Sequence, residues 1–345
     1  MNTKIRKTYN FLIRLLIIIA TYGFIYKEVF YGHDFNKILK EFKTVFDDPI
    51  SIFLLVSCII LVFVNWGIET VKWQYLILKI EKVSFFRSYK AVLSGVAISS
   101  FTPNRIGEFL GRVFILEKAN RVEGILITIL GSISQFLVTF ILGATGIAIF
   151  VMLFKDLITD ELGISGDTFI YLYLALALIA IALFAFLMML FLKVSVVKDF
   201  VNRLIGDRWK GLKKYTKVFN LYQARELLKV LGYSLLRYIV FTLQFYLMLR
   251  IFGINLPLIS GFIMISIILF TITIIPTIAI AELGIRGSVA LFIIGTYLES
   301  HGMSDFNLDL GIIAATSAIW LINLAIPALV GAIMVFNLKF FRKNA

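Results

Sequence analysis

The sequence has very little of the chemistry that enzymes and disulfide-stabilised proteins use. It contains one cysteine, Cys58, which lies in an apolar run, so there is no disulfide framework. Its two histidines, His33 and His301, fall in polar segments, and we do not expect them to form a metal site. No zinc-protease helix, nucleophile elbow, metal-spaced acid cluster or Gly-x4-Gly-Lys-Ser/Thr phosphate loop appears. We therefore expect no catalytic residue, no metal, no cofactor and no direct drive by ATP.

Charged residues are also scarce, at 16% of the chain, while 60% of its 345 residues are hydrophobic. The mean hydropathy is +0.94, and several apolar runs approach or exceed the ~20 residues that span a bilayer. The composition predicts an all-α, polytopic helical membrane protein, with residues 1–345 as a single integral membrane domain. About six full spans are expected, at residues 11–31, 50–68, 124–154, 169–192, 230–252 and 311–336. No small-residue cleavage site follows the first, which indicates an uncleaved helix.

Two stretches interrupt this apolar pattern. Residues 102–112 read TPNRIGEFLGR, and residues 276–287 read PTIAIAELGIRG. Each has a proline, then a glutamate, then an arginine four residues later, a spacing that places acid and base on one helix face. Because an ionisable residue within a membrane is a functional hypothesis by default, we expect the two stretches to form the working centre together.

The apolar segments beside these stretches are short. Residues 88–101 reach only ~21 Å as a helix, less than the ~30 Å hydrocarbon core, and residues 109–116 form a second short piece. Segments 258–275 and 288–298 flank the second stretch in the same way. We predict two broken or re-entrant helical hairpins in an inverted repeat, with pseudo-repeat halves near 50–154 and 230–337. Two alternatives stay open: each hairpin could be two short crossings, or the prolines and glycines could only kink packed helices.

The net charge of +13 is distributed as the positive-inside rule requires and does not indicate a nucleic-acid partner. Of the 34 Lys and Arg residues, 27 lie in residues 1–14, 69–121, 193–237 and the C-terminus. This bias predicts a multi-pass protein of the cell (inner) membrane with both termini cytoplasmic and a cytoplasmic basic loop at 193–229. The first hairpin then enters from the cytoplasm and the second from outside.

The segment 69–87 is expected to be a helix extension or a surface helix. It contains Trp73 and Tyr75, which such a helix would place at the level of the lipid headgroups. The polar residues Asn65, Gln135, Gln244 and Asn323 lie in apolar runs, where interhelical hydrogen bonding is their commonest role.

At its two charged stretches the chain resembles the integral membrane region of lysylphosphatidylglycerol synthase, the flippase-like domain of multiple-peptide-resistance proteins. The first stretch matches the pattern Pro-x-Arg-x-Gly-Glu. The second, usually Gly-Gly-Leu-Gly-Val-Arg-Glu, here reads AELGIRG from residue 281, so Gly284 and Arg286 match. The acid after the arginine is absent, and Glu282 stands four residues before it instead. The resemblance implies lipid translocation between leaflets without fixing the lipid. We expect this protein to lack the soluble aminoacyl-transfer domain and therefore not to synthesise lysyl-lipid.

Guanidinium groups suit a lipid phosphate because their forked donors match its oxygens, and the glutamates would neutralise them when no lipid is bound. The residues predicted to bind or move lipid are Pro103, Asn104, Arg105, Gly107, Glu108, Arg112, Pro276, Glu282, Gly284 and Arg286. The alternative is that the Glu–Arg pairs are internal staples that only satisfy each other.

The sequence thus predicts a flippase that moves a phospholipid or related polar lipid between leaflets of a bacterial cell membrane. Two other classes stay open. One is an intramembrane enzyme acting on phospholipid or polyprenyl phosphate, and the other is a non-transporting accessory protein of envelope synthesis. A membrane lipid is the expected partner, and an envelope-synthesis enzyme is a further candidate.

Overall fold

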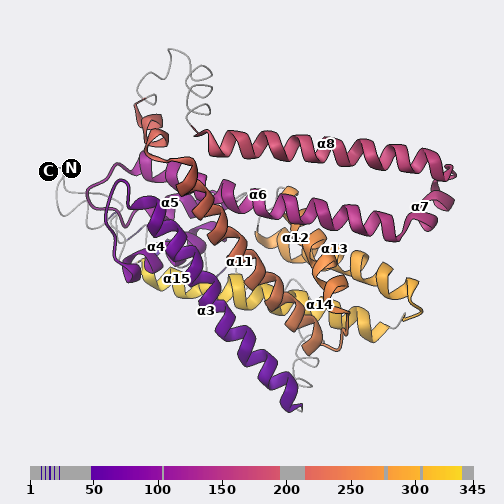
Figure 1. Ribbon diagram of the computed structural model, residues 1–345. Helices are drawn as coiled ribbons and strands as arrows, with labels where there is room; N and C mark the ends of the chain where they lie inside the picture. Colours follow the sequence, from indigo (N-terminus) through magenta and orange to yellow (C-terminus); the bar gives the residue numbers. More distant parts are fainter. Residues whose placement is uncertain are drawn as a thin grey trace.

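The computed structural model describes residues 48–102, 105–194, 214–275, 279–303 and 306–335, together with isolated positions between 9 and 23. All regular secondary structure in these ranges is helical, which confirms the polytopic helical class (Figure 1). Five helical stretches are long and apolar enough to cross a membrane. They are α3 (Pro49–Ile77), α6 (Arg121–Leu153), α8 (Gly166–Leu192), α11 (Ala224–Ile251) and a composite of α14 (Phe306–Trp320), the π-helical turn η3 (Leu321–Ala325) and α15 (Ile326–Met334). The predicted span 11–31 lies outside the described ranges.

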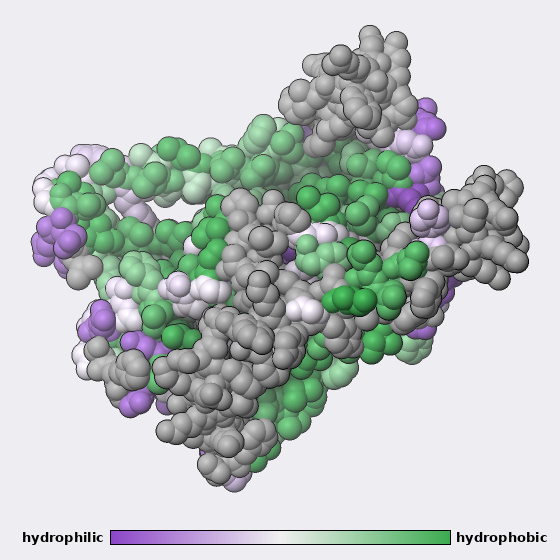
Figure 2. Space-filling model, turned by 180° about the vertical axis from the view of Figure 1, so that it is seen from behind, coloured by the Kyte–Doolittle hydropathy of each residue, from purple (hydrophilic) through white to green (hydrophobic). Residues whose placement is uncertain are grey.

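The surface of these helices is apolar where a soluble protein would be polar. Helix α8 carries a long series of exposed aliphatic side chains, including Leu172, Leu176 and Ile179, each more than half exposed. Figure 2 shows apolar residues over much of the visible face, with hydrophilic residues gathered mainly toward two opposite ends. Lipid is the environment in which such a surface is stable, so the molecule is built to lie in a bilayer.

We name the two ends of the bundle by the short helices that lie there. At the η2 end, α3 finishes, α6 and α11 begin, and the 3₁₀ helix η2 (Tyr215–Leu221) covers them. There the Tyr222 hydroxyl donates to the Leu76 carbonyl at 2.7 Å. At the α7 end, α7 (Lys155–Leu162) joins α6 to α8, with Gly163 in the left-handed conformation at its C-terminus. One hydrophobic cluster lies toward each end.

The first predicted hairpin is α4 (Phe85–Ser99) followed by α5 (Gly107–Val113). At its base, toward the η2 end, the Arg87 side chain donates to the Ile115 carbonyl at 3.1 Å. The two helices touch backbone to backbone, since a Cβ on Gly111 would lie 2.5 Å from the Gly95 Cα. At ~22 Å and ~10 Å, neither helix is long enough to cross the bilayer. The chain therefore enters from the η2 end and turns back.

The second hairpin is α12 (Leu258–Ile274) followed by α13 (Ala279–Ser300), and it enters from the opposite end. Its base lies toward the α7 end, where the Tyr297 hydroxyl donates to the Ser260 hydroxyl at 3.3 Å. The return helix is longer than the segment 288–298 predicted from the sequence, because the helix already begins at Ala279 and contains residues 279–287 of the second charged stretch. Glycines lower helix stability without ending a helix, so Gly284 and Gly287 are accommodated within it.

The expectation that Trp73 lies at the headgroup level is wrong. Helix α3 continues through this segment to Ile77, as a helix extension would. Trp73 is only 1% exposed, and its indole N–H donates to the Thr128 hydroxyl of α6 at 3.1 Å. The tryptophan is thus part of the core toward the η2 end. The polar face of the same helical turn carries Glu69 and Lys72, which are also buried.

Candidate functional site

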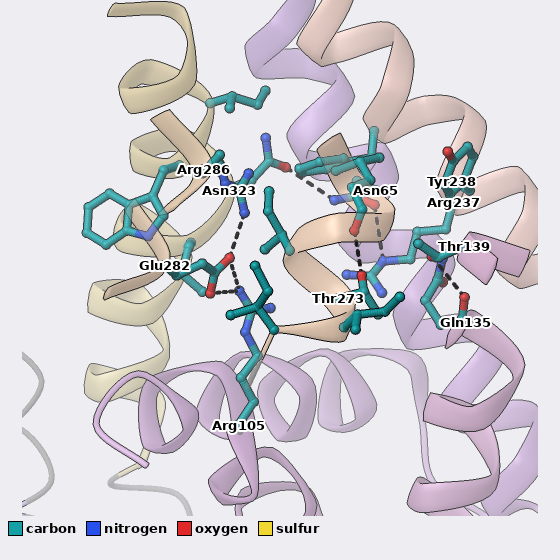
Figure 3. A pocket seen from close by; sticks show the side chains of 18 of the residues that line it. Asn65, Arg105, Gln135, Thr139, Arg237, Tyr238, Thr273, Glu282, Arg286 and Asn323 are labelled. Atoms are coloured by element: carbon teal, nitrogen blue, oxygen red, sulfur yellow. Dashed lines mark hydrogen bonds and ion pairs between the residues drawn. The ribbon is translucent and has the colours of Figure 1, made fainter. Parts of the chain in front are cut away.

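The tips of the two opposed hairpins meet at a cavity of about 490 Å³. The cavity lies between the two hydrophobic clusters and is walled by α3, α6, α11, α12, α13, α14 and η3, with Arg105, two residues before α5, completing it. Its polar and charged lining residues are Asn65, Trp66, Arg105, Gln135, Thr139, Arg237, Tyr238, Thr273, Glu282, Arg286, Trp320 and Asn323. Figure 3 shows these side chains converging from both halves of the chain.

Glu282 lies between two arginines from different hairpins. It accepts from the Arg286 guanidinium, one helical turn on, at 2.6 Å. Both of its oxygens also lie 2.7 Å from Nη2 of Arg105, in the turn of the other hairpin. The i,i+4 pair predicted within the second stretch is therefore present, and a cross-hairpin pair joins the two stretches (Figure 3).

Arg105, which makes the contact with Glu282, has a left-handed backbone conformation. Its φ is +55°, and it is the only non-glycine residue with positive φ in the ranges that the structure describes. A left-handed conformation costs an L-residue roughly 1–2 kcal/mol. A hydrogen bond across the turn stabilises this conformation, since the Gly107 N–H donates to the Thr102 hydroxyl at 2.9 Å. Such local strain is often found at functional sites.

The pair predicted in the first stretch, Glu108 with Arg112, is also present. It does not line the cavity. Arg112 also donates to Glu69 of α3 at 2.7 Å, and this buried carboxylate is a hub for two further cations. Lys72 lies 2.8 Å and Arg237 of α11 lies 3.1 Å from its other oxygen.

This Glu69 hub was missed in the sequence, where residues 69–87 looked like a surface segment. The available signal was a glutamate one turn beyond Asn65, at the end of an apolar run, together with Arg237 inside another apolar run. Arg237 connects the hub to the cavity wall. It donates to Asn65 at 3.2 Å and lies 5.2 Å over the Trp66 ring.

Asn323 of η3 extends the hydrogen-bonded series that begins with Arg237 and Asn65. Its side-chain oxygen accepts from Asn65 at 3.2 Å, so the interhelical role predicted for these asparagines is confirmed. It lies in the π-helical turn of η3, four residues before Pro327. Proline has no N–H to donate to the Asn323 carbonyl, which favours the wider turn at this point, and such turns are frequent at functional sites.

The remaining predicted residues are placed as follows. Gly107 packs against α4, since a Cβ there would lie 2.5 Å from the Ile98 carbonyl oxygen. Gly284 is exposed and has nothing within 4 Å of such an atom. Pro103, Asn104 and Pro276 lie outside the described residues. Of the seven predicted site residues that the structure describes, three line the cavity, namely Arg105, Glu282 and Arg286.

The other two predicted polar contacts differ from one another. Gln244 is fully buried away from the cavity, and its amide donates to the Cys58 carbonyl at 2.9 Å, as an interhelical bond would. Gln135 donates to the Ser234 carbonyl at 3.4 Å but also lines the cavity. Within the described part of the chain, no three His, Cys, Asp or Glu side chains gather as a metal site would require.

The cavity brings together the guanidinium groups of Arg105, Arg237 and Arg286 where the two broken hairpins meet. Guanidinium donors grouped in this way can bind the oxygens of an anion such as a phosphate. Comparison with known proteins found no match among curated proteins and none among solved structures. The sequence profile of one family, described as lysylphosphatidylglycerol synthase TM region, matches residues 11–331. The match covers nearly the whole chain, and the protein therefore belongs to this family.

Proposed function

We propose that this protein moves a phosphate-bearing lipid between the leaflets of a cell membrane. The observation that carries the proposal is the meeting of two oppositely entering hairpins at one polar cavity, joined by the pair Arg105–Glu282. Hairpins of opposite entry around a site near the bilayer midplane are the architecture of transporters that alternate their access. Membership in the family named above supports a lipid-related function.

In this proposal Arg105 and Arg286 bind the lipid phosphate, and Glu282 holds them when the site is empty. When a phosphate binds, its oxygens take the place of the Glu282 carboxylate as acceptors for the arginines. The Arg105–Glu282 pair between the hairpin tips then weakens while Arg105 keeps an anionic partner. Separation of the tips then opens the cavity toward one end or the other. From the positive-inside bias we infer that the η2 end faces the cytoplasm, together with both termini.

Reconstitution into liposomes tests the proposal. The purified chain is incorporated into vesicles that contain a lipid with a reporter headgroup, and loss of that reporter to a membrane-impermeant quencher is followed with time. We expect the accessible fraction to rise above the outer-leaflet half only with active protein. If accessibility stays unchanged for every phosphate-bearing lipid tested, the protein does not translocate them, and a non-transporting accessory role becomes the better explanation. Chemical conversion of the lipid, detected by chromatography of the same vesicles, would indicate an intramembrane enzyme.

A further inference from the structure

The charge of the cavity wall points to the class of lipid. Three guanidinium groups line the cavity, on Arg105, Arg237 and Arg286, against one carboxylate, on Glu282. The wall therefore carries an excess of two positive charges among the described residues. Building on the proposed function, we propose that the cavity selects a lipid whose headgroup is a phosphate monoester or diphosphate, carrying close to two negative charges.

The groups behind the wall do not remove this excess. Arg237 is paired with Glu69, but Glu69 also serves Lys72 and Arg112. Adding Glu108, the partner of Arg112, completes the network. The two connected networks together contain five cations and three carboxylates, again an excess of two positive charges. Each cation has a carboxylate partner, but the carboxylates are shared, so an anion in the cavity would supply the negative charge that the two networks lack.

A second, independent observation points to the same ligand. Four buried nitrogen donors that belong to cavity-lining residues have no partner among the described residues. They are the indole N–H groups of Trp66 and Trp320, the amide of Asn323 and Nε of Arg286. Each of these residues is at most 6% exposed. Buried donors are normally satisfied, and a group with several acceptor oxygens would satisfy them.

Phosphate monoesters fit both observations better than other headgroups. A monoester offers three terminal oxygens and a charge of about −1.5 to −2 at pH 7. A phosphodiester such as phosphatidylglycerol offers two such oxygens and one negative charge. A zwitterionic headgroup brings a cation that the positively charged wall repels.

Binding measurements on the full chain in nanodiscs test this inference separately from transport. The probes are phosphatidic acid, phosphatidylglycerol and phosphatidylcholine with matched acyl chains, each displacing a fluorescent phosphatidic acid, and inorganic phosphate as the free anion. We expect phosphatidic acid to compete about tenfold or more better than phosphatidylglycerol, and phosphatidylcholine to remain at background. Inorganic phosphate should compete far more weakly than phosphatidic acid, because it lacks the acyl chains.

Two variants sharpen the test. Arg286→Gln removes one positive charge, and the preference for phosphatidic acid over phosphatidylglycerol should shrink toward one. Trp320→Phe removes the indole N–H donor and leaves an aromatic side chain. Binding of both lipids should therefore weaken, while the ratio of their affinities stays the same. Lys79→Gln is the matched control, since its pair with Glu226 lies at the η2 end outside the cavity and should change neither value.

Three results would overturn the inference: equal competition by the three lipids, equal competition by inorganic phosphate, or an unchanged preference in folded Arg286→Gln protein. The proposed function has a separate outcome. If lipids cross the bilayer without regard to headgroup charge, translocation stands and the charge selection fails. If phosphatidic acid binds selectively and no lipid crosses, the selection stands and the translocation fails.

Discussion

Arg105 and Glu282 are 177 residues apart in the sequence, yet one guanidinium nitrogen lies 2.7 Å from both oxygens of that carboxylate. The contact joins the tips of two hairpins that enter the bundle from opposite ends. Glu282 also pairs with Arg286, and it is the one acidic side chain among the described residues that line the cavity.

We expect Arg105→Gln to reduce lipid translocation by about tenfold or more, since a charge-assisted hydrogen bond contributes ~1.5–3 kcal/mol. The protein should still fold, because the Arg105 side chain is 42% exposed. Arg105→Lys should recover only part of the activity, as an ammonium is a point charge without a planar fork. The readout is the liposome accessibility assay. Lys79→Gln, which breaks a pair with Glu226 at the η2 end outside the cavity, is the control and should transport normally. Wild-type rates in Arg105→Gln would show that this arginine has no part in transport.

Glu69→Gln should destabilise the protein by ~3–5 kcal/mol, because the buried Lys72 and Arg112 and the partly buried Arg237 then lose their shared carboxylate. Thermal unfolding in detergent measures the loss. Adding Lys72→Met should recover part of it by removing one of the orphaned charges. Lys79→Gln breaks a pair whose side chains are 34% and 23% exposed and should have a much smaller effect. A Glu69→Gln protein as stable as wild type would contradict the role of Glu69 as a hub.

Two glycines from the charged stretches should respond in opposite ways to alanine. Gly111→Ala inserts a methyl group 2.5 Å from the Gly95 Cα, so α4 and α5 must separate, at a cost of ~1–3 kcal/mol. Gly284→Ala meets nothing within 4 Å and lies inside α13, so it should stabilise the helix by up to about 1 kcal/mol. Unfolding temperatures of the two variants provide the comparison. Equal shifts of the same sign would exclude this packing difference.

Glu81 should make the stability of the η2 end depend on pH. Partial burial alone would raise the pKa of Glu81, but hydrogen bonds from the N–H groups of Ala119, Glu117 and Lys118 hold that pKa below its ordinary value. A depressed pKa means that the carboxylate stabilises the folded protein at neutral pH and loses this effect as it becomes protonated. Wild type and Glu81→Gln should therefore differ most in unfolding temperature near pH 7 and converge below about pH 4. A gap that is independent of pH would assign the effect to packing instead.

The sequence predicted the helical class, the two broken hairpins and both i,i+4 pairs, because apolar run length and helical spacing are local properties. Three of the seven predicted site residues that the structure describes line the cavity. The Glu69 hub escaped prediction because the partners of Glu69 lie on two other helices, α5 and α11, as well as on its own. The cross-hairpin pair and the donors of Trp66 and Trp320 likewise depend on tertiary packing, which no local pattern encodes.

The separation of Arg105 and Glu282 along the chain also imposes an order on biosynthesis. At ~5–20 residues per second, the ribosome makes Arg105 roughly 9–35 s before it makes Glu282. During that interval the arginine, in its strained turn, has not yet met the carboxylate that receives it in the finished protein. The centre of the molecule is therefore assembled late, when α13 arrives from the far end of the bundle. A chain that stops before α13 would lack Glu282, so Arg105 at the tip of the first hairpin would be in the membrane without this carboxylate partner.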